Sequence, residues 1–253
     1  MFELNLLGPV TLRRDGRALA VTVKKSQALL LLLALGGRHG RERVTALLWP
    51  TLDVTSSRRN LRRELARLRE SGADGFVHAD GDMLALADAV VCDVRTFADA
   101  VRRGEPEAAL LHWHGEPGTD LRLDADDGTF HDWLAAQRKP LVDLRQQALA
   151  AAAALHEAAG AWQPAIGHLN CLLADDPLQE RHHRAMIRVL QAAGRREDAL
   201  AQYQRCRDLL AAELGLQPMA ETEALVGTLR STPPQQPQTQ QPQQQQQPQQ
   251  AHE

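Results

Sequence analysis

The pattern of apolar and polar residues differs between the beginning, the later part and the end of the chain. Through about residue 23, apolar and polar residues alternate and are interrupted by the turn signals Gly8-Pro9 and Asp15-Gly16, which predicts a small antiparallel sheet. From about residue 93 to residue 230 the chain is rich in alanine and leucine at helical spacing. Residues 231–253 are almost wholly proline and glutamine, a composition that cannot bury a core.

Three helices are predicted after the first sheet. The run 26–35 is apolar nearly all round, which is typical of a buried helix. A second helix is expected over about 41–49, because Pro50 prevents it from continuing. Aspartate, threonine and serine then supply cap residues for a third helix over 57–69.

The stretch 76–88 predicts a β-hairpin that turns at Asp80-Gly81. A sheet, three helices and a terminal hairpin, in this order, predict an α+β winged helix-turn-helix domain over residues 1–90, whose third helix enters the major groove of DNA. We expect an all-α domain of tetratricopeptide-like repeats over 91–230 and a disordered Pro/Gln-rich tail over 231–253.

The repeat prediction comes from an internal period of 34 residues, the tetratricopeptide period. Four positions recur at this distance: Gly160, Ala165, Ile166 and Leu169 are matched by Gly194, Ala199, Leu200 and Tyr203. The helices expected to complete the array lie near 93–103, 105–113 and 128–159.

The third predicted helix, SRRNLRRELARLR, contains six arginines and one acidic residue. Leu61, Leu65 and Leu68 recur at i, i+4 and i+7 and form one apolar stripe. The polar residues lie opposite this stripe or beside it, as a helix that reads DNA requires. A merely solvated charged face is the alternative, but such a face tends to carry acidic partners at i,i+4, which this helix lacks.

The charge of the chain is divided along its length. The net charge is −3, but residues 1–70 carry 14 basic against 6 acidic residues, whereas residues 71–230 carry 15 against 25. The front part is therefore suited to a polyanion. Three scattered cysteines without a CxxC pair indicate neither a disulfide framework nor a zinc site, and the apolar run 28–35 is too short to span a bilayer. We expect a cytoplasmic protein.

Several segments resemble one bacterial family. They are LNLLGPVTLRRDGRAL, KKSQALLLLLAL and RERVTALLWP near the start, and FHDWLAAQRKPL, DDPLQERHHRAMIRVLQAAGRREDALAQY and AELGLQPMAETEAL further on. Together they make the chain similar, over about 2–230, to the Streptomyces antibiotic regulatory proteins. This family joins an OmpR/PhoB-type winged helix to a bacterial transcriptional activation domain of tetratricopeptide-like repeats.

The resemblance implies a transcriptional regulator, and more specifically an activator. It would bind double-stranded promoter DNA, commonly at direct repeats, associate with itself there and recruit RNA polymerase. By position, the DNA contacts would come from Arg58, Arg59, Asn60, Arg62, Arg63, Arg67, Lys24 and Lys25. The hairpin tip 78–82 is acidic where the family often has a basic residue, and no GxxxxGK[ST] phosphate loop is present.

No sequence motif indicates an enzyme, a cofactor or a metal. Neighbouring histidines on one helix point about 100° apart, so we interpret the following five as structural or surface residues: His112, His114, His131, His182 and His183. The alternative function is a protein-interaction scaffold without affinity for duplex DNA, which the acidic hairpin tip favours. A salt titration of DNA binding separates the two.

Overall fold

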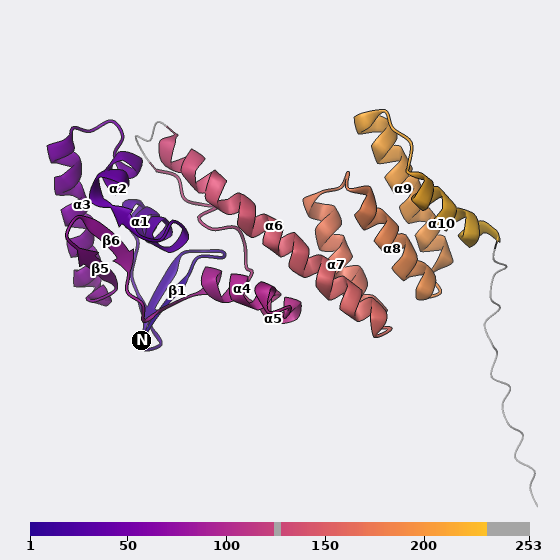
Figure 1. Cartoon of the computed structure of the whole chain (residues 1–253), viewed down its shortest axis with the longest axis horizontal. Coiled ribbons are helices and arrows are strands. Elements are labelled where there is room, and N and C mark those ends of the chain that lie inside the picture. Colours follow the sequence, from indigo (N-terminus) through magenta and orange to yellow (C-terminus); the bar gives the residue numbers. More distant parts are fainter. Residues whose placement is uncertain (124–127, 232–253) are drawn as a thin grey trace, which may run out of the picture. The chain divides into compact units, whose positions relative to one another are not determined.

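The computed structural model of the chain describes residues 1–123 and 128–231 (Figure 1). They divide into two units, one over Met1–His182 and the other from His183 onward. Of the expected tail, Ser231 ends the last helix, and residues 232–253 lie outside the described residues. No helix within 1–123 or 128–231 combines the length and apolar character needed to cross a membrane.

The first sheet contains the predicted hairpins and one strand that the sequence did not reveal. Its order is β3-β2-β1-β7, built from β1 (Phe2–Asn5), β2 (Thr11–Arg14), β3 (Arg17–Leu19) and β7 (Val90–Cys92). The β2–β3 turn has positive φ at both Asp15 (51°) and Gly16 (77°), as a type I′ turn requires. Strand β7 pairs parallel with β1 and joins the end of the first domain to its beginning.

The three predicted helices are confirmed, with shifted ends. They are α1 (Lys24–Leu35), α2 (Arg41–Leu48) and α3 (Val54–Leu68), and α3 is followed by a short turn, η1 (Arg69–Ala73), in which Gly72 has a non-helical backbone with φ of 96°. Helix α1 is buried as its apolar pattern predicts, since none of the five leucines 29–33 is exposed to solvent. Helix α3 begins three residues before the predicted start because the Asp53 carboxylate caps it, accepting a 3.0 Å hydrogen bond from the Ser56 backbone amide.

The predicted second hairpin is also present. It consists of β5 (Val77–Asp80) and β6 (Met83–Leu86), and β6 also pairs with the two-residue strand β4 (His39–Gly40), which directly precedes α2. The order of sheet, three helices and hairpin is consistent with the winged helix-turn-helix that the sequence predicts.

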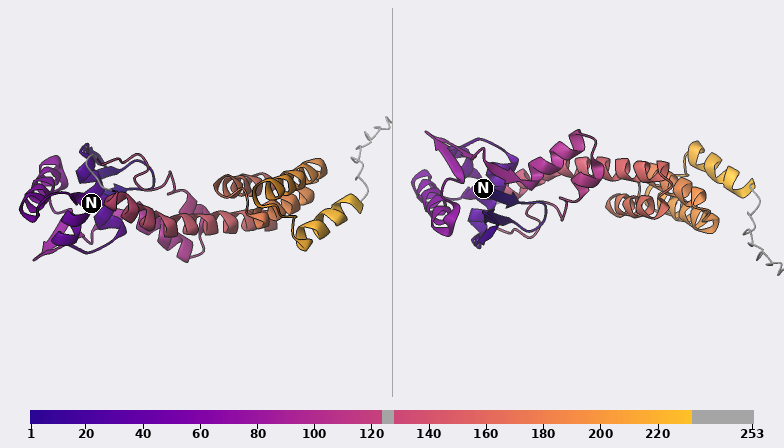
Figure 2. Two further views of the ribbon diagram at one scale, coloured as in Figure 1. Left: turned by 90° about the horizontal axis from the view of Figure 1, so that it is seen from above. Right: turned by 90° about the horizontal axis from the view of Figure 1, so that it is seen from below.

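The rest of the first unit is helical, as expected. It contains α4 (Asp93–Arg102), α5 (Pro106–Leu110), α6 (Thr129–Ala158), α7 (Trp162–Asp175) and the beginning of α8 (Glu180–Ala192). Helix α6 is 30 residues long and packs along α7, as the views in Figures 1 and 2 show.

A buried carboxylate connects the strands to these helices. Asp93, the first residue of α4, is 8% exposed and accepts hydrogen bonds of 2.8–2.9 Å from the backbone amides of Leu6, Leu7 and Val94. Burial raises the pKa of this carboxyl, although the three amide donors act in the opposite direction. The end of β1 and the start of α4 are thus held by one side chain.

The second unit contains the remainder of α8, then α9 (Arg196–Leu214) and α10 (Ala220–Ser231). The predicted period of 34 residues is visible in the helix ends: α6 and α8 end 34 residues apart, at 158 and 192, and α7 and α9 begin at 162 and 196. Gly160 and Gly194 occupy equivalent turns with φ of 69° and 74°, a conformation that favours glycine.

Candidate nucleic-acid interface

Helix α3 buries the leucine stripe that the sequence predicts. Leu61, Leu65 and Leu68 are 1%, 6% and 3% exposed, and they belong to the core of the first unit, which also contains the leucines of α1 and α2. This burial fixes the rotation of α3 about its own axis, so that its opposite side faces outward.

The outward side is basic. Arg58, Arg59, Arg62 and Arg63 are all exposed, and a guanidinium of Arg63 donates a 3.1 Å hydrogen bond to the half-buried side chain of Asn60. Figure 1 shows α3 on the outer side of its domain, away from α6 and α7 in the same unit. Within this unit the four arginines are therefore accessible to a ligand as large as a DNA duplex.

A groove runs beside this helix and collects further arginines. Arg58 and Arg62 of α3, Arg69 of η1 and Arg41 at the start of α2 line it, together with Asp82 from the tip of the β5–β6 hairpin. The backbone amide of Arg41 donates a 2.9 Å hydrogen bond to the Asp82 carbonyl, which holds the hairpin tip next to α2. The groove thus gathers four guanidinium groups against one carboxylate.

Arg67 has a different environment from the other arginines of α3. It donates a 2.6 Å hydrogen bond to Glu64, whose other carboxylate oxygen accepts a 2.7 Å hydrogen bond from the Ser26 hydroxyl. Glu64 is only 2% exposed, so Arg67 is tied to a buried carboxylate although its own side chain is 43% exposed. The sequence predicted Arg67 as a DNA contact without revealing this partner.

The two lysines at the start of α1 also differ from each other. Lys24 is exposed, whereas the ammonium of half-buried Lys25 donates to the Leu48 carbonyl and lies 5.9 Å from the centre of the Trp49 ring. The last carbonyls of a helix lack partners within the helix, and Lys25 satisfies one of them for α2. Lys25 therefore contributes to packing as well as to the basic surface.

The hairpin tip is as acidic as its sequence indicates. His78, Asp80 and Asp82 are exposed, and Asp80 forms a 2.7 Å ion pair with Arg38. This pair offsets part of the negative charge at the tip, but the carboxylate of Asp82 remains beside the arginine groove.

Sequence reasoning missed two kinds of functional candidate. Arg41 was not predicted as a contact because its place in the groove depends on the pairing of β4 with β6, which has no motif.

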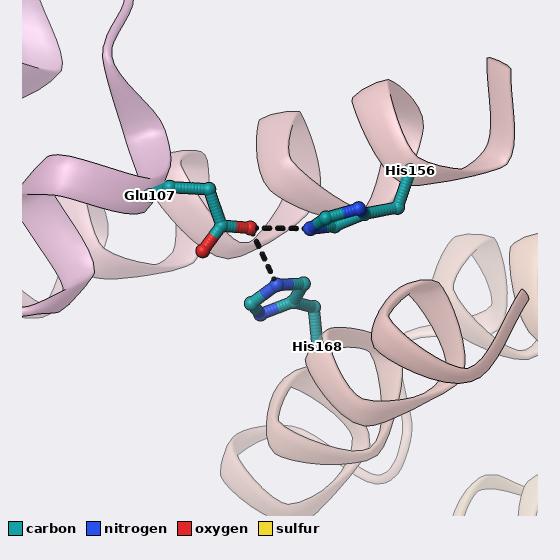
Figure 3. A group of neighbouring side chains, drawn as sticks. All are labelled: Glu107, His156 and His168. Carbon is teal, nitrogen blue, oxygen red and sulfur yellow. Dashed lines mark hydrogen bonds and ion pairs between the residues drawn. The ribbon is translucent and has the colours of Figure 1, made fainter. Parts of the chain in front are cut away.

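Similarly, Glu107, His156 and His168 come from three helices and converge on one point (Figure 3). Partial burial raises the pKa of the Glu107 carboxyl, but hydrogen bonds from the two histidines outweigh this and keep it below its usual value.

The five histidines interpreted from the sequence as structural or surface residues lie in different surroundings. His182 and His183 are 5% and 4% exposed, and the Nδ1 atom of His183 lies 2.7 Å from the Gln202 side-chain amide. The Nε2 atom of His131 lies 3.2 Å from the Leu121 carbonyl oxygen, and His112 and His114 are at least partly exposed.

Comparison with known proteins places these features in a family context. Residues 92–230, which are more than half of the chain, match the family model of the bacterial transcriptional activator domain. The match begins at the end of β7 and reaches Arg230 in α10, so it spans the described helices from α4 onward.

The chain is also similar to regulatory proteins over most of its length. It is 30% identical to the regulatory protein AfsR of Streptomyces coelicolor over 85% of this chain and 23% of that protein. It is 27% identical to the transcriptional regulatory protein EmbR of Mycobacterium tuberculosis over 88% of this chain and 62% of that protein. The chain therefore spans about a quarter of AfsR and less than two thirds of EmbR.

A solved structure supports the fold. The structure of Mycobacterium tuberculosis EmbR in complex with a low-affinity phosphopeptide superposes with a TM-score of 0.71 at 25% identity. The superposition covers 92% of this chain and 66% of the EmbR chain.

Proposed function

We propose that this chain, which belongs to the family of Streptomyces antibiotic regulatory protein-like regulators, activates transcription. These regulators carry a bacterial transcriptional activator domain. In this proposal the chain binds specific promoter DNA with α3 in the major groove. The observation that carries this proposal is the division of α3 into two sides. Its leucine stripe is buried in the protein while four arginines remain exposed on the other side. A helix of this kind can enter a groove without losing its own packing.

The surroundings of each residue suggest its role. Arg59 and Arg63, opposite the leucine stripe, would reach base edges, where arginine forms bidentate hydrogen bonds with guanine. Arg58 and Arg62, which line the groove beside α3, would contact phosphates, as would exposed Lys24. Asn60, held by Arg63, would orient that guanidinium or read an adenine.

The two remaining predicted contacts, Arg67 and Lys25, have partners within the protein. To reach DNA, Arg67 would have to leave the buried Glu64 carboxylate, and Lys25 would have to leave the Leu48 carbonyl. We therefore assign them a smaller share of the binding free energy than the exposed arginines.

The helical region would make the protein contacts of the regulator. We propose that the helices from α4 onward contact RNA polymerase in the cytoplasm, or a second copy of the chain bound at the next direct repeat. Support comes from the match of this region to the activator-domain family and from its excess of acidic residues, which does not suit DNA.

The test is a gel-shift titration with a duplex that the full-length chain itself selects from a random library. We expect the double variant Arg59→Ala/Arg63→Ala to bind this duplex about 30-fold or more weakly, because each bidentate base contact contributes roughly 1–3 kcal/mol. A matched control, Arg13→Ala/Arg17→Ala, removes the same charge from exposed positions in the β2–β3 hairpin. Equal losses in the two double variants, with unchanged circular dichroism, would refute the assignment to α3.

The second candidate is a protein-interaction scaffold without affinity for duplex DNA. The exposed carboxylates of Asp80 and Asp82 at the hairpin tip favour it, because they would repel phosphate where a winged helix usually contacts the backbone. Failure of the full-length chain to enrich any duplex from the library at low salt would support the scaffold over the regulator.

A further inference from the structure

Three potential metal ligands from three different helices meet at the surface of the first unit (Figure 3). The Nε2 atom of His156, in the last turn of α6, lies 2.6 Å from Oε1 of Glu107 on α5. The Nε2 atom of His168 on α7 lies 2.9 Å from the same oxygen. The two imidazole rings are stacked, with centroids 5.5 Å apart and planes inclined by 14°.

This arrangement has the chemistry of a divalent transition-metal site. Two imidazole nitrogens and one carboxylate oxygen are a recurrent donor set for zinc, usually with a fourth position left for water. In this cluster one such atom from each residue lies within 4.8 Å of the others. Around a tetrahedral zinc ion the ligand atoms lie about 3.3 Å apart, so the two distances from Glu107 to the histidine nitrogens need to lengthen by about 0.4–0.7 Å.

The side chains have the freedom that this adjustment needs. The Glu107 side chain is 53% exposed and can rotate, whereas those of His156 and His168 are 27% and 19% exposed and are held by their helices. Solvent therefore reaches the cluster from one side, where a water molecule can complete the coordination of an ion.

Without an ion, the two histidines of this cluster share one hydrogen-bond acceptor, the Oε1 atom of Glu107. To donate to Glu107, each Nε2 atom must carry a proton, and both protons then point at one carboxylate oxygen. With the proton of each ring on Nδ1 instead, both Nε2 lone pairs face the position of the Glu107 oxygen, and a single divalent ion can bind all three side chains at once.

From these observations we propose that Glu107, His156 and His168 bind one zinc-like divalent transition-metal ion, which fastens α5 to the α6–α7 pair. Helix α5 has only five residues and is too short to be stable through its own hydrogen bonds. A metal bond to Glu107 adds a strong attachment between this short helix and two long ones. This site is independent of DNA binding by α3.

The proposal is tested on the full-length chain, first freed of metal with a chelator, by calorimetric titration with zinc chloride and by the visible absorption of added Co²⁺. We expect one ion per chain, a Co²⁺ spectrum of low-symmetry tetrahedral or five-coordinate type, and an unfolding temperature that rises with zinc concentration. The variants His156→Ala, His168→Ala and Glu107→Gln should each weaken binding by about tenfold or more. His114→Ala and Cys171→Ser are matched controls, since both residues are exposed and lie outside the cluster.

The outcome does not depend on the variants folding. In the unaltered chain, zinc should protect His156 and His168 from diethyl pyrocarbonate, as read by mass spectrometry, while His114 stays reactive. Absence of saturable binding, unchanged affinity in all three ligand variants, equal losses in the two controls, or equal protection of His114 would each overturn the site.

Discussion

At the scale of single residues, a polar cluster lies beside the buried leucines on the side of α3 that faces α1. Glu64 accepts hydrogen bonds from the Ser26 hydroxyl of α1 and from Arg67 one turn further along α3. A buried carboxylate is costly unless such partners are present, and here both of its oxygens are occupied. These hydrogen bonds are directional, whereas the apolar contacts of the leucine stripe are not. The cluster therefore fixes the position of α3 against α1 more specifically than the leucines alone.

The Glu64→Ala variant tests this role. We expect it to lower the free energy of unfolding by about 2 kcal/mol, because Ser26 loses its buried partner while Arg67 can turn to solvent. Tryptophan fluorescence during urea unfolding reports on the first unit, which contains all four tryptophans: Trp49, Trp113, Trp133 and Trp162. Exposed Glu70 is the control, since Glu70→Ala should change stability by less than about 0.5 kcal/mol. Equal stabilities of the two variants would contradict the role of Glu64.

At the scale of elements, α6 shows that packing can keep a helix continuous through a residue that disfavours helix. Pro140 lies in the middle of this 30-residue helix, yet the helix continues through it. Proline cannot donate to the carbonyl four residues earlier, that of Ala136. Both residues are exposed, so water can satisfy this carbonyl, and the buried residues on the opposite side keep the helix continuous.

Replacing Pro140 by alanine should therefore stabilise the first unit. Alanine is about 3 kcal/mol more favourable than proline in a helix interior, and loss of the proline restraint on the unfolded chain returns up to roughly 1 kcal/mol, which leaves about 2 kcal/mol. The measurement is urea unfolding followed by tryptophan fluorescence, with Lys139→Ala as the neighbouring control. A stability equal to or below that of the unaltered chain would show that proline at position 140 is needed for the packing of α6.

The helices and strands also show which features the sequence predicts and which it does not. Periodicity located the helices of the first domain because each buries leucine side chains, and cap residues marked the stretch before α3, although the predicted start at residue 57 is three residues later than the observed one. Pairings between distant segments carried no local signal. Strand β7 pairs with β1 across 84 intervening residues, and the Glu107–His156–His168 cluster depends on how α5, α6 and α7 are aligned.

The arginine side of α3 illustrates the same limit. Helical geometry correctly predicted that Leu61, Leu65 and Leu68 are buried. It did not separate Arg67 from Arg63, because the difference lies in Glu64 turning inward to meet Ser26 of another helix. The assignment of DNA contacts therefore stays a prediction that needs binding data.

At the scale of the whole molecule, charge is separated rather than neutralised. The chain carries a net charge of −3, which taken alone predicts repulsion from DNA, yet residues 1–70 carry an excess of eight positive charges. At physiological ionic strength, charges interact over only about 8 Å, so a duplex against α3 responds to the local arginines and not to the total. The relevant quantity is the number of phosphates that the basic surface neutralises.

This number can be measured in a salt titration of the full-length chain on its selected duplex. If Arg58, Arg62 and Lys24, the residues assigned to phosphates, neutralise about three of them, the logarithm of the association constant should fall with the logarithm of salt concentration with a slope of about −2.5 to −3, or roughly 40-fold between 50 and 200 mM. The Arg58→Ala variant should make the slope shallower by about one, because it removes one phosphate contact. Arg13→Ala, on the β2–β3 hairpin, should leave the slope unchanged. A slope near zero, or an equal change in both variants, would mean that the basic side of α3 does not hold DNA, whatever the family of the helical region.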